Sequence, residues 1–223
     1  MYVVMARTGG EGPAAFRPSS SKKTLPGSVS EPMRRRWAGT RSRRPKWCWT
    51  GCGCRPMRCW AAPTGGAGFS IAMNGLNGGR LNIAACSLGG AQAAFDKATS
   101  YLLHRQAFGM TLLDEPTIRF TLADMATALE TSRMLLWRAA SALDDDAADK
   151  VELCAMAKRY VTDACFDVAD KALQLHGGYG YLREYGLEKI VRDLRVHRIL
   201  EGTNEIMRVV IGRAEAARVR ATV

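Results

Sequence analysis

Residues 174–208 read QLHGGYGYLREYGLEKIVRDLRVHRILEGTNEIMR, and this stretch holds the most informative pattern in the chain. Thr203 is a residue type that favours a helix N-cap, and apolar residues recur after it at helical spacing, so a helix is predicted from there. Glu201 lies just before that helix, where backbone N–H groups are free. Upstream, the glycines at 177, 178 and 180 allow a sharp turn and a close approach to a ligand.

Two interpretations of this stretch are open. In one, a short basic helix brings the glycine loop and Glu201 to a ligand, and Gln174 and His176 add polar groups at the loop. In the other, Thr203 caps a helix and the glycines form a helix-to-helix turn, which requires no ligand. Local spacing alone favours the second interpretation.

Apolar residues elsewhere also recur at helical spacing. Long stripes run through residues 80–105, 117–143 and 147–175. The second stripe includes Phe120, Met125 and Leu129. A short helix at 190–194 and a last long helix at 203–219 follow. Four long helices with short joins predict an all-α fold, an antiparallel four-helix bundle within residues 68–223.

The first 60 residues differ from the rest in composition. They hold 13 of the 32 Lys and Arg residues but only 2 of the 21 Asp and Glu residues, so all of the net charge of +11 lies there. They also hold four of the five Trp and four of the seven Cys, with no Ile, Asp, Asn or Gln. Such a segment cannot build an ordinary hydrophobic core.

Three explanations of this basic segment compete. Arginine runs such as that at 34–36 could contact nucleic acid, but they show no helical or strand period. The cysteines at 48, 52, 54 and 59 could bind zinc, but their spacing lacks the paired C-x2-C arrangement. An excess of Arg, Trp, Cys, Gly and Pro is also what GC-rich coding sequence yields when read out of frame. We therefore predict that residues 16–67 are non-native, with no metal site and no nucleic-acid partner.

The remaining cysteines, Cys86, Cys154 and Cys165, fall on apolar helix faces and are far apart in sequence. We expect reduced core thiols, as in an intracellular protein. No run of 18 apolar residues exists, and the first 15 residues lack the order of a secretion signal. No membrane partner is therefore predicted.

Three blocks of the opening stretch resemble the carboxyl-terminal signature of the acyl-CoA dehydrogenase family: QLHGGYG at 174–180, RDLRVHRI at 192–199 and LEGTNEI at 200–206. GLNGGR at 75–80 and RQAFG at 105–109 extend the resemblance over residues 68–216. It looks closest to the branch that acts on isobutyryl-CoA in valine breakdown. Residues 1–9 resemble a strand of the family's middle β-domain, so residues 1–67 are expected to be an irregular, disordered remnant of that domain.

The resemblance implies FAD-dependent α,β-dehydrogenation of a short branched acyl-CoA thioester, with electrons passed to an electron-transfer flavoprotein. Glu201 matches the family's catalytic base, which removes the α-proton while the flavin accepts the β-hydrogen as hydride. The matching substrate contacts are Arg80 and Gly202. The matching flavin contacts are Arg105, Phe108, Gln174, Gly177, Gly178, Thr203 and Glu205. Because some of these flavin contacts act across subunits in the family, a homotetramer is implied.

The chain also departs from the family pattern. At Glu115-Pro116 the family usually has glutamine at the second position, and proline offers neither an amide side chain nor a backbone donor. The family's amino-terminal helical domain and most of its middle β-domain are not in the sequence. A second function is therefore open: a truncated, non-catalytic helical bundle that only oligomerises. The resemblance predicts the cytoplasm if the source is bacterial and the mitochondrial matrix if it is eukaryotic.

Overall fold

The computed structural model describes residues 2–7, 16–21, 28–30, 47–49 and 67–222, with side chains described for 71–222. The chain divides into two compact units, Met1–Leu76 and Asn77–Val223. In the first unit the described strands form two antiparallel pairs: β1 (Tyr2–Arg7) with β2 (Phe16–Ser21), and β3 (Ser28–Ser30) with β4 (Trp47–Trp49).

Strand β1 covers most of residues 1–9, the stretch that resembles a family strand, and it pairs with β2 from Tyr2 opposite Ser21 to Arg7 opposite Phe16. The expectations of a non-native segment over residues 16–67 and of accidental cysteines concern, for the most part, residues outside the described ones. They stay predictions.

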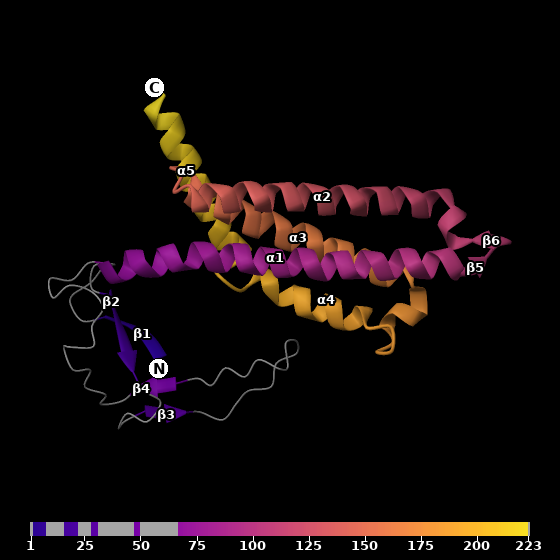
Figure 1. Ribbon diagram of the computed structural model, residues 1–223, viewed down its shortest axis with the longest axis horizontal. Helices are drawn as coiled ribbons and strands as arrows, with labels where there is room; N and C mark the ends of the chain where they lie inside the picture. Colours follow the sequence, from indigo (N-terminus) through magenta and orange to yellow (C-terminus); the bar gives the residue numbers. More distant parts are fainter. Residues whose placement is uncertain (1, 8–15, 22–27, 31–46, 50–66, 223) are drawn as a thin grey trace. The chain divides into compact units, whose positions relative to one another are not determined.

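Three long helices lie lengthwise side by side in the rest of the chain (Figure 1): α1 (Ala67–His104), α2 (Pro116–Asp144) and α3 (Lys150–Leu175). The shorter helices α4 (Leu187–Arg195) and α5 (Asn204–Ala221) follow. The connections contain a small hairpin and three 3-10 turns: β5 (Gln106–Ala107), β6 (Met110–Thr111), η3 (Leu112–Asp114), η4 (Gly177–Tyr181) and η5 (Val196–Arg198). The predicted all-α bundle is thereby confirmed.

Helix α1 begins 13 residues before the predicted start at Arg80. Gly75, Gly78 and Gly79 therefore lie inside a helix, although glycine disfavours a helix interior by about 1 kcal/mol relative to alanine. At Gly79 the reason is a close neighbour from another part of the chain, described below.

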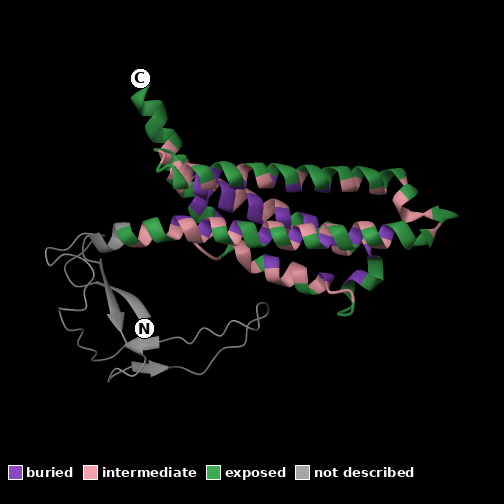
Figure 2. Cartoon of the chain, viewed as in Figure 1, coloured by how far each residue is buried: buried purple, intermediate pink, exposed green. Residues whose placement is uncertain are grey.

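The bundle core is built on small side chains of α1. Ala84, Ala91, Ala94 and Ala98 are fully buried and share one apolar cluster with residues of α2, α3 and α4. Figure 2 shows the buried faces of the long helices turned toward one another. At Gly90 an added Cβ would lie 2.6 Å from Cδ1 of Leu194, so α4 approaches α1 closely there. Short side chains thus set the spacing between α1 and its neighbours.

Two expectations about burial are wrong. Phe120 is 69% exposed, while Met125 and Leu129 of the same predicted stripe are buried, because the buried face of α2 starts further along the helix. Cys86 is exposed because the next position, Ser87, faces the interior instead. Cys154 and Cys165 are buried as expected, and burial raises the pKa of the Cys165 thiol to about 12.

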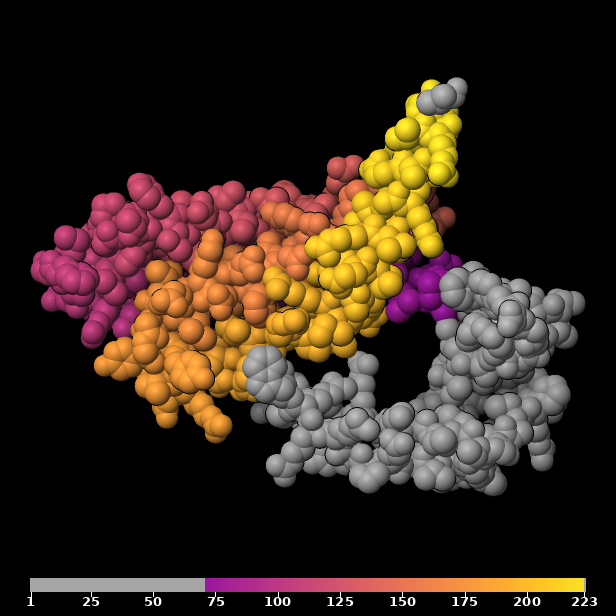
Figure 3. All heavy atoms as spheres, turned by 180° about the vertical axis from the view of Figure 1, so that it is seen from behind, coloured from indigo at the N-terminus to yellow at the C-terminus, as the bar shows by residue number. Residues whose placement is uncertain are grey.

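Helix α5 extends beyond the other helices at its carboxyl end (Figures 1 and 3). Its Arg218 donates from Nη2 to Oε2 of the buried Glu152 on α3 at 2.6 Å, which ties α5 to the first turn of α3. Ile206 and Val209, which belong to the apolar repeat after Thr203, are about half exposed. None of the helices in the described part of the chain is long and apolar enough to cross a membrane.

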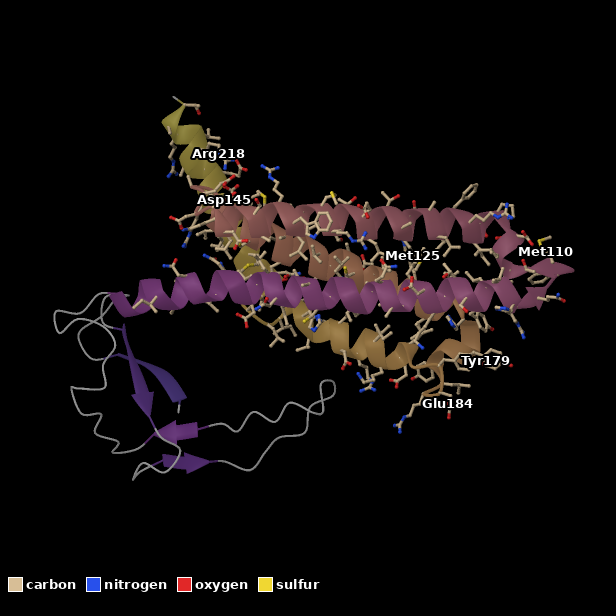
Figure 4. The ribbon with its side chains drawn as sticks, in the orientation of Figure 1. Met110, Met125, Asp145, Tyr179, Glu184 and Arg218 are labelled. Carbon is tan, nitrogen blue, oxygen red and sulfur yellow. The ribbon has the colours of Figure 1, made fainter. Side chains whose placement is uncertain are left out.

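A methionine pair on α2 tests this packing. Met125 is fully buried and points into the bundle (Figure 4), whereas Met134 is 45% exposed. We predict that Met125→Ala lowers the free energy of unfolding by about 2–5 kcal/mol, since it leaves a cavity. Met134→Ala should change it by less than about 0.5 kcal/mol. Urea titrations followed by circular dichroism measure both, and equal effects would contradict the assigned face of α2.

Candidate functional site

Glu201 lies in a strained turn between η5 and α5. Its φ is +57° and that of Gly202 is +90°, so both residues adopt left-handed backbone geometry, which is uncommon for a residue other than glycine. The turn directs the Glu201 carboxyl group onto α1. An added Cβ at Gly79 would lie 2.8 Å from Cδ and 3.3 Å from Oε1 of Glu201, so only glycine fits there without moving the carboxylate.

Lys158 of α3 also holds this turn. Its side chain is fully buried, and Nζ donates to the carbonyl oxygen of Gly202 at 2.7 Å and to that of Arg198 at 3.2 Å. A third bond, of 2.8 Å, goes to Oδ1 of Asn204, the first residue of α5. The residues on both sides of Glu201 are therefore tied to one ammonium group.

Arg80 is the second buried cation beside Glu201. It is 6% exposed, and Nη1 donates to Oδ1 of Asn77 at 2.9 Å. Its Nε is buried and has no hydrogen-bond acceptor within the described residues. Burial lowers the pKa of the Arg80 guanidinium, while the nearby Cys154 and Glu201 raise it. The predicted substrate contact Arg80 and the predicted base Glu201 are thus brought together.

The start of α5 follows the sequence prediction. Oγ1 of Thr203 accepts a hydrogen bond from the backbone N–H of Ile206 at 3.4 Å, which makes Thr203 the N-cap. Glu205 is exposed in the first turn, and hydrogen bonds from its own backbone N–H and from Thr203 lower the pKa of its carboxyl group. Both lie within four residues of Glu201.

The other predicted flavin contacts gather where α1 ends. Arg105, Gln174, Gly177 and Gly178 line a cavity of about 520 Å³ between the end of α1 and turn η4. The Arg105 guanidinium lies 5.7 Å from the ring centroid of Tyr179, the residue that marks this end of the bundle in Figure 4. Gly177 has a φ of +57°, and an added Cβ at Gly178 would meet no atom within 4 Å. The loop therefore presents open backbone to the cavity.

Phe108 lies nearby but does not line this cavity. It occupies the β5–β6 hairpin turn with a φ of +54°, followed by Gly109 at +80°, and its side chain is 93% exposed. Two successive positive φ values are what a tight two-residue hairpin requires. The same region contains the departure from the family pattern, and Pro116 there occupies the first turn of α2, behind the N-cap Glu115.

An aromatic cluster that sequence reasoning missed supports the glycine loop. The rings of Tyr101 and the buried His176 stack with centroids 4.3 Å apart, and Tyr185 packs edge-on to both. His176 also bonds through Nδ1 to the carbonyl oxygen of Ala172 at 2.9 Å. The cluster joins α1 to the loop after α3 and so fixes where η4 begins. No short-range pattern pairs residues 75 positions apart.

The two groups of predicted residues lie at different places along α1. Arg80 and Arg105 are separated by 25 residues, nearly all helical, which corresponds to about 37 Å at 1.5 Å per residue. One group surrounds Glu201 and the other surrounds the cavity. In residues 71–222 no cluster of three or more His, Cys, Asp or Glu side chains could hold a metal ion, and the cysteines of the basic segment lie outside that range.

Comparison with known proteins identifies the family. Residues 66–216 match the acyl-CoA dehydrogenase C-terminal domain, which is more than half of the chain. The chain therefore belongs to the acyl-CoA dehydrogenase family. The structural match agrees: the butyryl-CoA dehydrogenase of Megasphaera elsdenii superposes with a TM-score of 0.91 at 31% identity, over 96% of this chain and 56% of that one.

Two curated relatives show how much of the chain is shared. The mitochondrial isobutyryl-CoA dehydrogenase of Bos taurus is 44% identical over 214 residues, 96% of this chain and 51% of the relative. The CarC subunit of the caffeyl-CoA reductase–Etf complex of Acetobacterium woodii is 44% identical over 144 residues, 65% of this chain and 38% of the relative. The chain thus spans about half, or less, of the length of these relatives.

The glycines of η4 provide a matched test of the cavity wall. An added Cβ at Gly180 would collide with the backbone carbonyl oxygen of Leu173 and lie 3.1 Å from Cβ of His176. We predict that Gly180→Ala destabilises the fold by about 1–3 kcal/mol, because the backbone must shift. Gly178→Ala, where there is free space, should leave the melting temperature within about 2 °C. Thermal melts measure both, and a tolerated alanine at 180 would contradict this turn.

Proposed function

We propose that this chain supplies the catalytic base, Glu201, of an FAD-dependent acyl-CoA dehydrogenase that acts on a short branched acyl-CoA such as isobutyryl-CoA, in valine breakdown. The observation that carries the proposal is the left-handed turn that directs the Glu201 carboxylate onto Gly79, beside the buried Arg80. Strained backbone of this kind is characteristic of functional sites. The 44% identity to the bovine isobutyryl-CoA dehydrogenase supports the substrate class.

The residues at the end of α1 fit a dinucleotide. Arg105 is exposed and can bind pyrophosphate oxygens in a forked geometry, and the glycines at 177 and 178 let a ligand approach the backbone. Gln174 adds an amide at the same cavity, and the exposed ring of Phe108 offers an apolar contact. These residues would hold FAD, and so would Thr203 and Glu205 beside Glu201.

The distance between these two groups favours flavin sites that are formed by two subunits together. Since Arg80 and Arg105 lie about 37 Å apart along α1, the Glu201 end and the cavity end of one chain face different ligand molecules or distant parts of one. A homotetramer in which one subunit's cavity end meets another subunit's Glu201 end accommodates both groups at each flavin. We include that assembly in the proposal.

The chemistry assigns one task to each group near Glu201. When bound, FAD would accept the β-hydrogen of the substrate as a hydride. The Glu201 carboxylate takes the α-proton as general base. The backbone N–H of Glu201, which has no hydrogen-bond acceptor within the described residues, donates to the thioester carbonyl oxygen and stabilises the charge that develops there. Gly202, the next residue after Glu201, contacts the substrate.

Electrons then pass to an electron-transfer flavoprotein in this proposal. The support is the similarity to CarC, a subunit of a complex that includes Etf. The proposed compartment is the mitochondrial matrix for a eukaryotic source and the cytoplasm for a bacterial one, and the bovine relative is named as mitochondrial. The flavin absorbance of the purified protein tests the proposal, since isobutyryl-CoA should bleach it. A colourless helical protein would support the non-catalytic, oligomerising bundle instead.

Glu201→Gln tests the base. Glutamine keeps the size of the side chain but cannot accept the α-proton, so flavin reduction by acyl-CoA should slow by about 10²–10⁴-fold in FAD-loaded protein. Glu215→Gln, which removes an equal charge further along α5 where Glu215 pairs with Arg218 at 2.7 Å on the surface, should leave the rate nearly unchanged. Anaerobic stopped-flow absorbance measures both. Equal slowing by the two substitutions would place the base elsewhere.

Arg105→Ala tests the cavity end. Loss of a charge-assisted hydrogen bond to a phosphate should weaken FAD binding by roughly 1.5–3 kcal/mol. Arg119→Ala is the control, because Arg119 is also exposed but pairs with Asp114 at 2.7 Å on the surface of α2. Flavin retention after dilution and filtration gives the comparison. If both variants kept the parental flavin content, Arg105 would have no part in holding the cofactor.

A further inference from the structure

Lys158 is the largest fully buried side chain among the described residues, and it is a cation. A buried ammonium group is stable only when its donors are satisfied. Each of its three bonds goes to a residue between positions 198 and 204, and none of these acceptors is a carboxylate. Lys158 is therefore placed to fix the backbone of that turn. This arrangement differs from an ordinary ion pair.

Asn204 extends this network into α3. Its Oδ1 accepts from Lys158, while its Nδ2 donates to Oδ1 of Asp163 at 2.9 Å and to Oγ1 of Thr162 at 3.0 Å. Asn204 is 3% exposed. The first residue of α5 is thus fixed on α3 by side-chain bonds. Both ends of the turn that carries Glu201 are anchored to one helix.

We infer that Lys158 is a positioning residue that holds the Glu201 turn in its left-handed conformation, with the carboxylate against α1. The inference rests on the proposed function of Glu201 and adds a residue that the family resemblance did not assign. A left-handed conformation costs a non-glycine residue about 1–2 kcal/mol, so the surrounding contacts must maintain it. The bonds from Lys158 to Gly202 and Asn204 are the nearest such contacts on the carboxyl side of Glu201.

The protonation state of Lys158 decides how many of these bonds form. Burial lowers the pKa of the Lys158 ammonium to about 8, with Arg80 also lowering it and Asp163, Glu205 and Glu201 raising it. The partly buried His197 faces it as well, since Lys158 contributes to lowering the pKa of that imidazole. Below pH 8 the ammonium donates three bonds, whereas the neutral amine above pH 8 has only two N–H groups. The turn should therefore loosen as the pH rises through 8.

Hydrogen exchange tests the inference without cofactor. In Lys158→Met, the amides of Ile199 and Leu200, which donate to the carbonyl oxygen of Val196, should exchange at least tenfold faster relative to those in the middle of α2. Lys150→Met is the control, because Lys150 lies on the same helix but pairs with Asp146 at the surface. Should Lys158→Met fail to fold, the parent protein is measured from pH 7 to 9.5. There the turn should lose protection relative to α2 above pH 8, and constant relative protection would overturn the inference.

Flavin reduction separates positioning from general stability. In FAD-loaded protein at saturating isobutyryl-CoA, Lys158→Met should slow reduction on the order of 100-fold, the effect of a misplaced base, with little change in KM. In the parent protein, the rate of flavin reduction should fall as the pH rises through about 8 and Lys158 loses its proton. Lys158→Met should lack this fall, and Lys150→Met should keep it. A parental rate and pH profile in Lys158→Met would overturn the inference. If isobutyryl-CoA does not reduce the parent flavin, the proposed function fails, and hydrogen exchange alone decides the role of Lys158.

Discussion

The close contact between the Glu201 turn and α1 is the constraint on which the candidate site depends. It exists because α1 has no side chain at Gly79, where a Cβ would occupy the space of the carboxyl group. The alanines further along α1 and Gly90 also leave room for a neighbouring element, since they let α4 approach α1. The segment between α4 and α5, which carries Glu201, can then reach α1. A larger residue on this face would hold the turn away from α1.

Helix α1 also separates the two groups of proposed site residues. Its amino-terminal half meets Glu201, and its last turn meets the cavity formed with η4. A rigid helix of 38 residues keeps these regions far apart within one chain. Proposed contacts with one flavin from both regions thus require more than one subunit. The fold and the inferred assembly are linked by the length of this helix.

The helices were predictable from the sequence because their apolar residues follow the helical period over many turns. The glycines at 75, 78 and 79 concealed the true start of α1, because glycine disfavours a helix interior. Of the three, only Gly79 has a close neighbour, the Glu201 carboxyl group. Lys158 was missed for a related reason: a lysine inside a helix usually points to solvent, and its acceptors are backbone groups at least 40 residues away. Glu201, by contrast, was proposed as the base from the sequence block around it. The left-handed backbone conformation of Glu201 could not be predicted, although a glycine at the next position, Gly202, is consistent with it.

The most direct test of the central claim places a methyl group between Glu201 and α1. Gly79→Ala should push the carboxylate out of position, while the flexible side chain can move without unfolding the bundle. Gly78→Ala is the matched control, because an added Cβ there meets no atom within 4 Å. In FAD-loaded protein we predict flavin reduction by isobutyryl-CoA at least tenfold slower in Gly79→Ala than in Gly78→Ala, with equal melting temperatures. Equal rates in the two variants would contradict the claim that α1 positions the base.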